Sequence, residues 1–288
     1  MFPVNDLTVL IVTFKTDHKI LDECIKSIDS KSKIIIVENS NDQEFKKKYE
    51  EKFSNIEVFL SGKNLGYGVG NNFGLNLIKT NYALISNPDV VYEKDFFSFI
   101  DHYIKQDTEF DIIGPMYRKE DYASYGHFED LKKISPITKE GSLFSAHWIV
   151  GCTMLLNLKK FKDRNLFDEN FFLYFEEVDI LLRSKREKIA TYLFPFLKIK
   201  HMRSSSIKKN IKIDLLRAWH YMWSMFYFYK KNFGYISALK KTSKFLIKDL
   251  IVLLISIFFF DFKKMKLRFF RLYGLISSIL GLKSFLRP

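Results

Sequence analysis

Cysteine is scarce in this chain, and the common cysteine and phosphate-binding motifs are missing from it. The 288 residues include two cysteines, Cys24 and Cys152, and no CxxC pair. Two cysteines form at most one bridge, which excludes a disulfide scaffold, and without CxxC there is no sequence case for a structural zinc site. No GxxxxGK[ST] sequence occurs, which excludes a P-loop enzyme.

Neither the first residues nor the longest apolar run has the pattern of a signal peptide or a membrane span. Its first residues, MFPVNDLTVLIVTF, have no basic stretch and no small-residue cleavage site, so we expect no signal peptide and a reducing, cytoplasmic setting. The apolar run 250–260 has eleven residues, well short of the ~20 that span a bilayer. Extending it upstream meets Lys248 and Asp249, which are costly at the centre of a membrane.

Positive charge is concentrated at the C-terminal end. Residues 198–288 hold 20 Lys and Arg against three acids, a net charge of +17, while residues 1–197 carry −4. This asymmetry indicates a polyanionic partner, either nucleic acid or an anionic membrane surface. The basic residues lie between long aliphatic runs, which favours a segment at the surface of an anionic leaflet and disfavours nucleic acid. A buried core helix beside a solvated basic stretch is the alternative.

Strands and helices alternate along residues 1–205, in a chain of globular composition (47% apolar, 27% charged). Apolar runs predict strands at 7–14, 33–37, 56–60, 82–86 and 111–114, and the segments between them predict helices at 18–27, 42–52, 71–78 and 94–106. This alternation predicts an α/β fold with a mostly parallel central sheet and helices on both faces. A boundary near residue 205 separates this domain, 1–205, from a basic, amphipathic helical region, 206–288.

Polar side chains gather where the predicted strands end. Thr13 follows the first strand, Glu38 the second, the glycine-rich stretch 62–70 the third, and Asn87 and Asp89 the fourth. In open α/β sheets ligands bind outside the carboxyl ends of the strands, so these positions are candidates for a binding site. The glycines do not form a dinucleotide-binding fingerprint, because that motif follows the first strand and the turn there has no glycine.

Three features indicate chemistry at this edge, and each has a purely structural alternative. Asp89 is placed either to hold a divalent cation or to cap a helix. Glu176, Glu177 and Asp179 follow an aromatic run that buries carboxylates and raises their pKa toward that of a general base; alternatively they form a solvated helix N-terminus. His201 either adds an imidazole ligand beside Asp89 or serves only in packing.

Five motifs in a fixed order carry a resemblance to a known family. They are VTF (12–14), VENS (37–40), NLGYGVGNNFG (64–74), NPDV (87–90) and FDENFFLYFEEVDILLR (167–183). In this order they resemble the family 2 glycosyltransferases, in particular the bacterial rhamnosyltransferases that build cell-surface polysaccharides. The resemblance implies a GT-A fold, a nucleotide-diphosphate sugar donor, a divalent cation (Mn²⁺ or Mg²⁺) and inversion at the anomeric carbon.

The resemblance also implies roles for individual residues. Asp89 and His201 would hold the cation, and Glu177 would be the catalytic base. Asp179 and Arg183 would orient the loop or the acceptor, beside Glu176 in the same acid cluster. The donor pocket would be formed by Thr13, Glu38, Asn64, Gly66, Asn71, Asn72, Asn87 and Asp89. The family usually has aspartate at the positions of Glu38, Asn87 and Glu177, so this chain departs from its pattern there.

These expectations describe an inverting, metal-dependent hexosyltransferase of polysaccharide synthesis. Its donor would be a nucleotide-diphosphate sugar, with dTDP-rhamnose among the candidates, and its acceptor a glycan or a polyprenyl-diphosphate-linked sugar. The basic tail lies outside the motifs and would dock the enzyme as a peripheral protein at the inner face of the cell membrane. Another hexose or an N-acetylhexosamine donor, a nucleic-acid-binding protein, and a degenerate, non-catalytic transferase domain are the alternatives.

Overall fold

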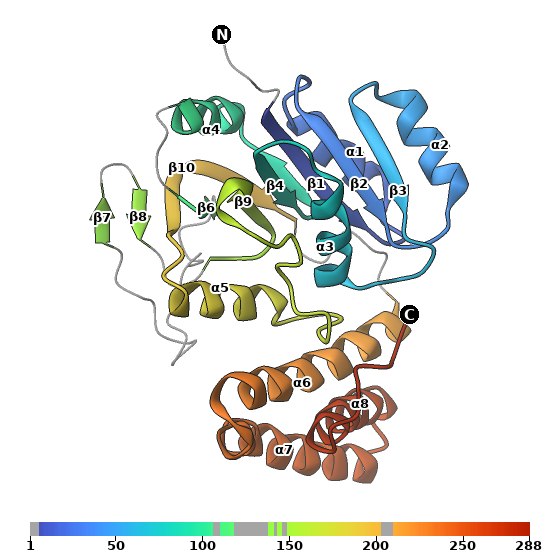
Figure 1. Ribbon diagram of the computed structural model, residues 1–288. Helices are drawn as coiled ribbons and strands as arrows, with labels where there is room; N and C mark the ends of the chain where they lie inside the picture. Colours follow the sequence, from blue (N-terminus) through green and yellow to red (C-terminus); the bar gives the residue numbers. More distant parts are fainter. Residues whose placement is uncertain (1–5, 106–109, 118–137, 141–142, 146–148, 203–209) are drawn as a thin grey trace. The chain divides into compact units, whose positions relative to one another are not determined.

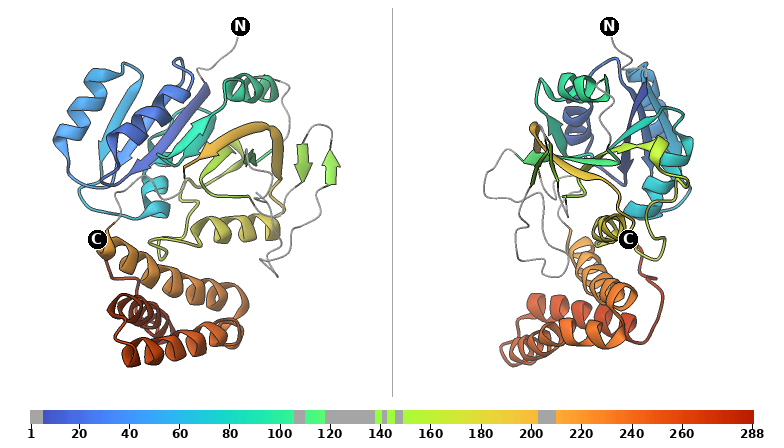
Figure 2. Two further views of the ribbon diagram at one scale, coloured as in Figure 1. Left: turned by 180° about the vertical axis from the view of Figure 1, so that it is seen from behind. Right: turned by 60° about the vertical axis from the view of Figure 1, so that its left-hand side comes forward.

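The computed structural model shows two compact units within this chain (Figures 1 and 2). The residues it describes are 6–105, 110–117, 138–140, 143–145, 149–202 and 210–288. The sheet unit comprises Met1–Leu65, Val69–Phe167 and Ile180–Lys208, and the helical unit comprises Gly66–Gly68, Asp168–Asp179 and Lys209–Pro288. The predicted boundary near residue 205 falls within 203–209, outside the described residues.

Four parallel strands form one side of the sheet. They are β1 (Leu7–Thr13), β2 (Lys33–Glu38), β3 (Ile56–Leu60) and β4 (Tyr82–Ser86), in the order β3-β2-β1-β4. The predicted strands are confirmed to within one residue, because runs of Val, Ile and Leu suit strands that are covered on both faces. β4 stops before Pro88, whose missing N–H cannot donate to a ladder.

Helices cover both faces of these strands, as predicted. The helices are α1 (His18–Ser27), α2 (Gln43–Lys52) and α3 (Tyr67–Leu77). Val9 and Ile11 of β1 belong to a core cluster with Leu21 of α1 and with residues of α2. Leu10, whose side chain points to the other face, lies against α3, where a Cβ added to Gly74 would come within 2.3 Å of it.

Mixed strands complete the sheet. The remaining elements of the sheet unit are β5 (Val90–Tyr92), α4 (Phe96–Lys105), β6 (Ile112–Tyr117), β7 (Thr138–Glu140), β8 (Leu143–Ser145), β9 (Thr153–Asn157), η2 (Leu158–Lys160) and β10 (Thr191–His201), with α5 (Glu176–Arg186) shared with the helical unit. β9 runs antiparallel between β4 and β6, and β10 pairs with β6, β8 and β5. The predicted helix 94–106 and strand 111–114 are confirmed as α4 and β6.

Two local expectations are corrected by the structure. Helix α3 begins at Tyr67 rather than at residue 71, so Gly68 and Gly70 are helical and not part of a loop. Glycine is a poor helix former, and two glycines in the first four residues mask the helical pattern. β10 is an eleven-residue strand in a region for which the sequence analysis predicted no strand.

Three long helices form most of the helical unit: α6 (Ile211–Phe233), α7 (Tyr235–Phe258) and α8 (Phe262–Ile279). α6 buries Trp219, Trp223 and Phe226, whose spacing of four and three residues places them on one face. α8 packs closely on α6 at Gly274. A Cβ added there would lie 2.2 Å from the carbonyl oxygen of Trp219, so a larger residue would not fit. Within the described residues, none of the helices is both long enough and apolar enough to cross a bilayer.

A buried ion triad joins α7 to α8. Asp249, 1% exposed, accepts hydrogen bonds from Arg268 Nη1 at 2.7 Å and from Arg271 Nε at 2.7 Å. Both of its carboxylate oxygens are therefore paired with a guanidinium. Removing the carboxylate leaves two partly buried cations without their counter-charge, and breaking a buried pair in this way is strongly destabilising.

We therefore expect Asp249→Ala to lower the free energy of unfolding of the helical unit by ~3–5 kcal/mol. The measurement is urea unfolding followed by tryptophan fluorescence, since Trp219 and Trp223 lie in this unit. Asp214→Ala, which removes an exposed acid from α6, is the matched control and should change the value by less than ~1 kcal/mol. Equal effects of the two substitutions would contradict a structural role for the triad.

Candidate active site

The ends of β1 and β2 bring two predicted donor-binding residues into contact. The parallel register places Thr13 opposite Glu38, and Thr13 Oγ1 donates to Glu38 Oε2 at 2.5 Å. Ser40 Oγ donates to the other carboxylate oxygen at 2.8 Å. Thr13 and Glu38 are both buried, so the carboxylate is held by two hydroxyls in a fixed orientation at the edge of the sheet.

The start of α3 lies against this edge. A Cβ added to Gly70 would come within 2.9 Å of Val12 and 3.2 Å of Asn39 Nδ2, so glycine allows the helix to approach the strands. Asn71 is fully buried next to it. Asn72 accepts from the backbone N–H of Phe167 at 2.9 Å and donates to its carbonyl at 2.8 Å. Asn72 therefore clamps the segment that leads to the acid cluster, and its predicted contact with a donor stays a prediction.

Gly66 and Asn64 precede this helix. Gly66 has a φ of +85°, and a Cβ there would lie 2.2 Å from the carbonyl oxygen of Phe172, so no other residue type fits. The backbone N–H of Tyr67 donates to the same carbonyl at 3.1 Å. Asn64 is half-buried. In the helical unit, the glycine stretch is thus joined to the aromatic run through its backbone.

Asp89 and His201 meet where β5 pairs with the end of β10. β5 pairs antiparallel with the end of β10, which places His201 opposite Val90, and the backbone N–H of Met202 donates to the carbonyl of Asp89 at 3.0 Å. His201 Nε2 lies 3.2 Å from Asp89 Oδ1, and Asp89 is buried. The structure therefore brings together two predicted cation ligands that are far apart in the sequence.

The pair is electrostatically coupled. Burial alone lowers the pKa of His201, but its hydrogen bonds to Asp89 and Cys152 and their charges outweigh burial and raise the pKa to about 9. The imidazole therefore carries a proton that the carboxylate stabilises. A divalent cation held by both groups would require the imidazole to lose that proton.

The donor set fits a cation that keeps water and phosphate ligands. No group of three or more His, Cys, Asp and Glu side chains that could hold a metal exists within the part of the chain that the structure describes. One carboxylate oxygen and one imidazole nitrogen are available, and Mg²⁺-type sites commonly use one or two protein ligands plus substrate phosphates. The half-buried Asn87, in the turn before Asp89, donates its backbone N–H to the carbonyl of Cys152 at 2.7 Å.

The acid cluster opens helix α5. Glu176 and Asp179 are buried and Glu177 is half-buried, so the cluster does lie at a helix N-terminus but is not the solvated one of the structural alternative. Burial raises the pKa of Glu176 well above its ordinary value, and the charge of Glu177 adds to the effect. Burial also raises the pKa of Glu177. Among the described residues, Glu176 Oε2 has no hydrogen-bond partner.

Backbone strain precedes these acids. Tyr174 and Phe175 have φ values of +72° and +70°, a left-handed conformation that costs non-glycine residues ~1–2 kcal/mol each. Both rings are held by Tyr221 of α6, at centroid distances of 5.6 and 5.7 Å. The packing of α6 therefore fixes the direction in which the chain enters α5, and such strain is typical of functional sites.

Lys231 of α6 connects Asp168, at the start of the loop 168–175, to Asp179 in the first turn of α5. Its ammonium lies 2.7 Å from Asp168 Oδ2 and 2.7 Å from Asp179 Oδ2. Asn232 donates to Asp179 Oδ1 at 3.0 Å, and Tyr227 donates to Asp168 Oδ2 at 3.0 Å. The sequence analysis missed Lys231, because nothing in the local pattern of α6 distinguishes it from the neighbouring Lys230.

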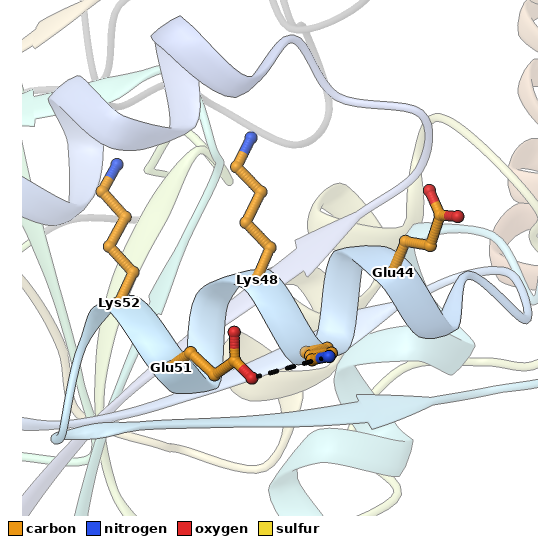
Figure 3. A pocket seen from close by; sticks show the side chains of 5 residues that line it. Glu44, Lys48, Glu51 and Lys52 are labelled. Carbon is orange, nitrogen blue, oxygen red and sulfur yellow. Dashed lines mark ion pairs between the residues drawn. The ribbon is translucent and has the colours of Figure 1, made fainter.

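The predicted site residues fall into two groups. Those in the sheet unit are Thr13, Glu38, Asn64, Asn71, Asn72, Asn87, Asp89, Arg183 and His201, and those in the helical unit are Gly66, Glu176, Glu177 and Asp179. Arg183 Nη2 donates to the carbonyl of Leu166, so it braces the loop within the sheet unit. A surface hollow lined by Glu44, Lys47, Lys48, Glu51 and Lys52 comes from one face of α2 and has the i,i+4 ion pairing of an ordinary solvated helix (Figure 3).

Comparison with known proteins gives a family and two named relatives. The profile of glycosyl transferase family 2 matches residues 8–175. The low-salt glycan biosynthesis hexosyltransferase Agl10 of Haloferax volcanii is 26% identical over 207 residues, 65% of this chain and 64% of that protein. The rhamnosyltransferase WbbL of Escherichia coli K12 is 24% identical over 188 residues, 56% of this chain and 69% of that protein. The chain thus spans about two-thirds of the length of these relatives.

A solved structure has the same fold. The mannosyltransferase PcManGT from Pyrobaculum calidifontis, in complex with GDP-Man and Mn²⁺, superposes with a TM-score of 0.55 and 10% identity, covering 96% of this chain and 87% of that one. At this identity the likeness establishes the fold alone. It confirms the expected GT-A architecture, with a mostly parallel central sheet followed by C-terminal helices.

Lys231→Met should destabilise the helical unit by ~3 kcal/mol, because it leaves the buried carboxylate of Asp179 and the half-buried carboxylate of Asp168 without their cation. Burial opposes ionisation of Asp168, but its hydrogen bond to Lys231 wins and lowers its pKa below the ordinary value. A lowered pKa stabilises the fold above the unfolded-state value of ~3.9, so the effect should be complete at pH 7 and shrink below about pH 4. Urea unfolding at several pH values measures this.

Lys230→Met is the control on the same helix, since Lys230 is exposed and makes no ion pair among the described residues. It should change stability by less than ~0.5 kcal/mol at any pH. If Lys231→Met changed the free energy of unfolding as little as this control does, the bridge between the two aspartates would not stabilise the fold.

Proposed function

The chain belongs to glycosyl transferase family 2, and from this we propose that it is an inverting, metal-dependent hexosyltransferase of cell-surface polysaccharide synthesis. It transfers rhamnose or another hexose from a nucleotide-diphosphate donor to a glycan or lipid-linked acceptor. The observation that carries the proposal is the convergence of Asp89 Oδ1 and His201 Nε2 to 3.2 Å at the sheet edge, where α/β folds bind ligands.

The nucleotide end of the donor binds at the ends of β1 and β2. Thr13 and Glu38 contact the nucleoside, and Glu38 is held for this by the hydroxyls of Thr13 and Ser40. Asn64, Gly66, Asn71 and Asn87 line the donor pocket, with Asn72 supporting it through the Phe167 backbone. The relatives act with hexosyl or rhamnosyl groups, which supports dTDP-rhamnose as the first donor to test.

Asp89 and His201 hold a divalent cation, Mn²⁺ or Mg²⁺, beside the diphosphate. When bound, the cation supplies Lewis-acid stabilisation of the charge that develops on the leaving diphosphate. Asp89 contributes an anionic oxygen ligand and His201 a neutral nitrogen, which requires the imidazole to give up the proton it shares with Asp89. Burial of Asp89 keeps competing water from this carboxylate.

Glu177 acts as the catalytic base. Its carboxylate takes the proton of the acceptor hydroxyl as the oxygen attacks the anomeric carbon; the bond to the diphosphate breaks, its electron pair leaves with the diphosphate, and the configuration inverts. Burial raises the pKa of Glu177, which makes the carboxylate a stronger base. Asp179 holds the loop through Lys231, and Arg183 holds it through the Leu166 carbonyl; Glu176 lies beside Glu177 in the same acid cluster.

The acceptor is presented at a membrane. The helical unit is strongly basic, and a peripheral position at the inner face of the cell membrane would bring the enzyme to polyprenyl-diphosphate-linked acceptors. Lysines on the unit would also attract the diphosphate of such an acceptor. We expect no role for nucleic acid.

The direct test is calorimetric binding of nucleoside diphosphates, combined with release of the nucleotide from a panel of nucleotide sugars. Binding and turnover should both require Mn²⁺ or Mg²⁺ and disappear with EDTA. Asp89→Asn should reduce turnover by ~10²-fold or more, because the anionic ligand is lost. Metal-dependent binding of nucleoside diphosphate without any turnover would instead identify a non-catalytic transferase domain.

Glu177→Gln should lower kcat by ~10²–10⁴-fold with little change in nucleotide affinity, since it removes only the base. In the parent enzyme, kcat/KM should fall as the pH decreases, and the apparent pKa of this fall should lie above the ordinary carboxylate value, because burial raises the pKa of Glu177 and of the neighbouring Glu176. The residual activity of the variant should not show this fall at low pH.

Glu187→Gln, at an exposed acid just beyond α5, is the matched control and should keep parental kinetics. A Glu177→Gln enzyme with parental kcat would remove Glu177 from the mechanism and point to Glu176, whose buried carboxylate begins the same helix.

A further inference from the structure

The buried stripe of helix α7 is mainly polar, and many of its large apolar side chains are exposed. The buried residues of α7 are Ala238, Thr242, Asp249 and Ser256, and α8 buries Leu272 and Leu275 together with Gly274, Ser277 and Ser278. A helix on the surface of a water-soluble protein normally has the opposite arrangement, with its apolar stripe toward the core. The packing of these helices therefore leaves large apolar side chains on the outside.

The outward residues of α7 form one continuous stripe. Along the helix the exposed apolar positions recur at intervals of three and four residues, which places them on one face. This outer stripe consists of Ile247, Leu250, Ile251, Leu254, Ile255 and Phe258. The run 250–260, which the sequence left open as a buried core helix, is thus mainly exposed in the structure.

The turn between the two helices is an aromatic tip. Phe258, Phe259 and Phe260 are 76%, 71% and 76% exposed, and Phe262 is 62% exposed. Asp261 caps α8 by accepting from the backbone N–H of Lys264 at 3.0 Å, and this cap fixes the turn that projects the rings. Four neighbouring exposed phenylalanines are costly in water and mark a surface with an apolar partner.

Cations flank this apolar surface, and its acids are neutralised. Lys263 and Lys266 follow the tip, and Lys240, Lys241, Lys244 and Lys248 lie on α7, all exposed. Asp249 is paired with Arg268 and Arg271, and Asp261 lies 2.9 Å from the Lys264 ammonium. These two acids are the only ones between Gly234 and Pro288. The surface therefore combines apolar contact with a net positive field.

We propose that the aromatic tip and the outer stripe of α7 insert into the headgroup region of a bilayer rich in anionic phospholipid. The apolar rings fit the boundary between headgroups and acyl chains, and the lysines fit the phosphate layer. Charge decides against a second copy of the chain as occupant, since two copies would bring like-charged lysines together. The inference names the membrane contact of the proposed function, and its test does not depend on sugar transfer.

The test uses the full chain labelled at the tip. Both native cysteines are buried, so Phe259→Cys gives a single reactive position for an environment-sensitive nitrobenzoxadiazole dye. With vesicles of phosphatidylglycerol and phosphatidylcholine, we expect its emission to shift to the blue and to be quenched by lipids that carry a quencher in the acyl chain. Lys47→Cys on α2, at an exposed site of the sheet unit, is the control, and a dye attached there should keep the emission it has in water.

Vesicle flotation of unlabelled variants separates the two contributions. Lys263→Gln with Lys266→Gln should weaken binding to anionic vesicles by about 30-fold, since each lysine near such a surface contributes about fivefold. Phe259→Ser with Phe260→Ser should weaken it by ~100-fold. Lys47→Gln with Lys48→Gln removes the same charge from α2 and should leave binding unchanged. All replaced side chains are exposed, so the unfolding midpoints should match the parent.

Three results would overturn the inference. One is a dye at position 259 that stays in water while the chain floats with the vesicles. Another is equal loss of binding in the α2 control, which would mean attraction by net charge alone. The third is a dye that becomes shielded without vesicles as protein concentration rises, together with a doubled mass in solution, which would identify a second copy as the occupant. A failed transferase assay beside a normal dye response would reject the proposed function and leave the membrane contact standing.

Discussion

The account depends on one electrostatic arrangement, the placing of the Asp89 carboxylate against the His201 imidazole. Neither group is stable there by itself, because a buried carboxylate needs a counter-charge and burial disfavours a protonated imidazole. The strands resolve this by geometry: β4 ends at Ser86, shortly before Pro88, β5 pairs antiparallel with the end of β10, and the two side chains meet at 3.2 Å. The raised pKa of His201 means that a proton on the imidazole offsets the cost of burying Asp89, and in the proposed function a divalent cation supplies the positive charge instead.

The second polar cluster follows a different physical rule. Three acids stand in the first turn of α5, where the helix dipole favours them, yet two of them are buried. Asp179 is neutralised by Lys231, whereas Glu176 and Glu177 have no ion pair with a cation within the described part of the chain, and their pKa values are raised. Asp179 thereby fixes the loop, and the other two acids are the ones from which we propose the base. Strain at Tyr174 and Phe175 is sustained by rings of α6.

The sequence predicted the parallel half of the fold well, because each strand there is a continuous apolar run bounded by turn residues. It failed where the signal depends on distant partners. The start of α3 is hidden by glycines that are needed for close packing on β1, and β10 contains lysines at positions exposed on one face. For the site, residue types at strand ends were enough to nominate Asp89 and Glu38. The Lys231 bridge and the inverted polarity of α7 arise only from tertiary packing, which no local pattern encodes.

The central claim is that Asp89 and His201 together hold a divalent cation when nucleotide is present. Pulsed electron paramagnetic resonance of Mn²⁺ added to the protein with a nucleoside diphosphate examines the ligands of the metal directly. The account predicts one bound Mn²⁺ per chain, with ³¹P coupling from the diphosphate and ¹⁴N coupling that disappears in His201→Ala. Bound Mn²⁺ with phosphorus coupling but no nitrogen coupling in the parent protein would contradict it.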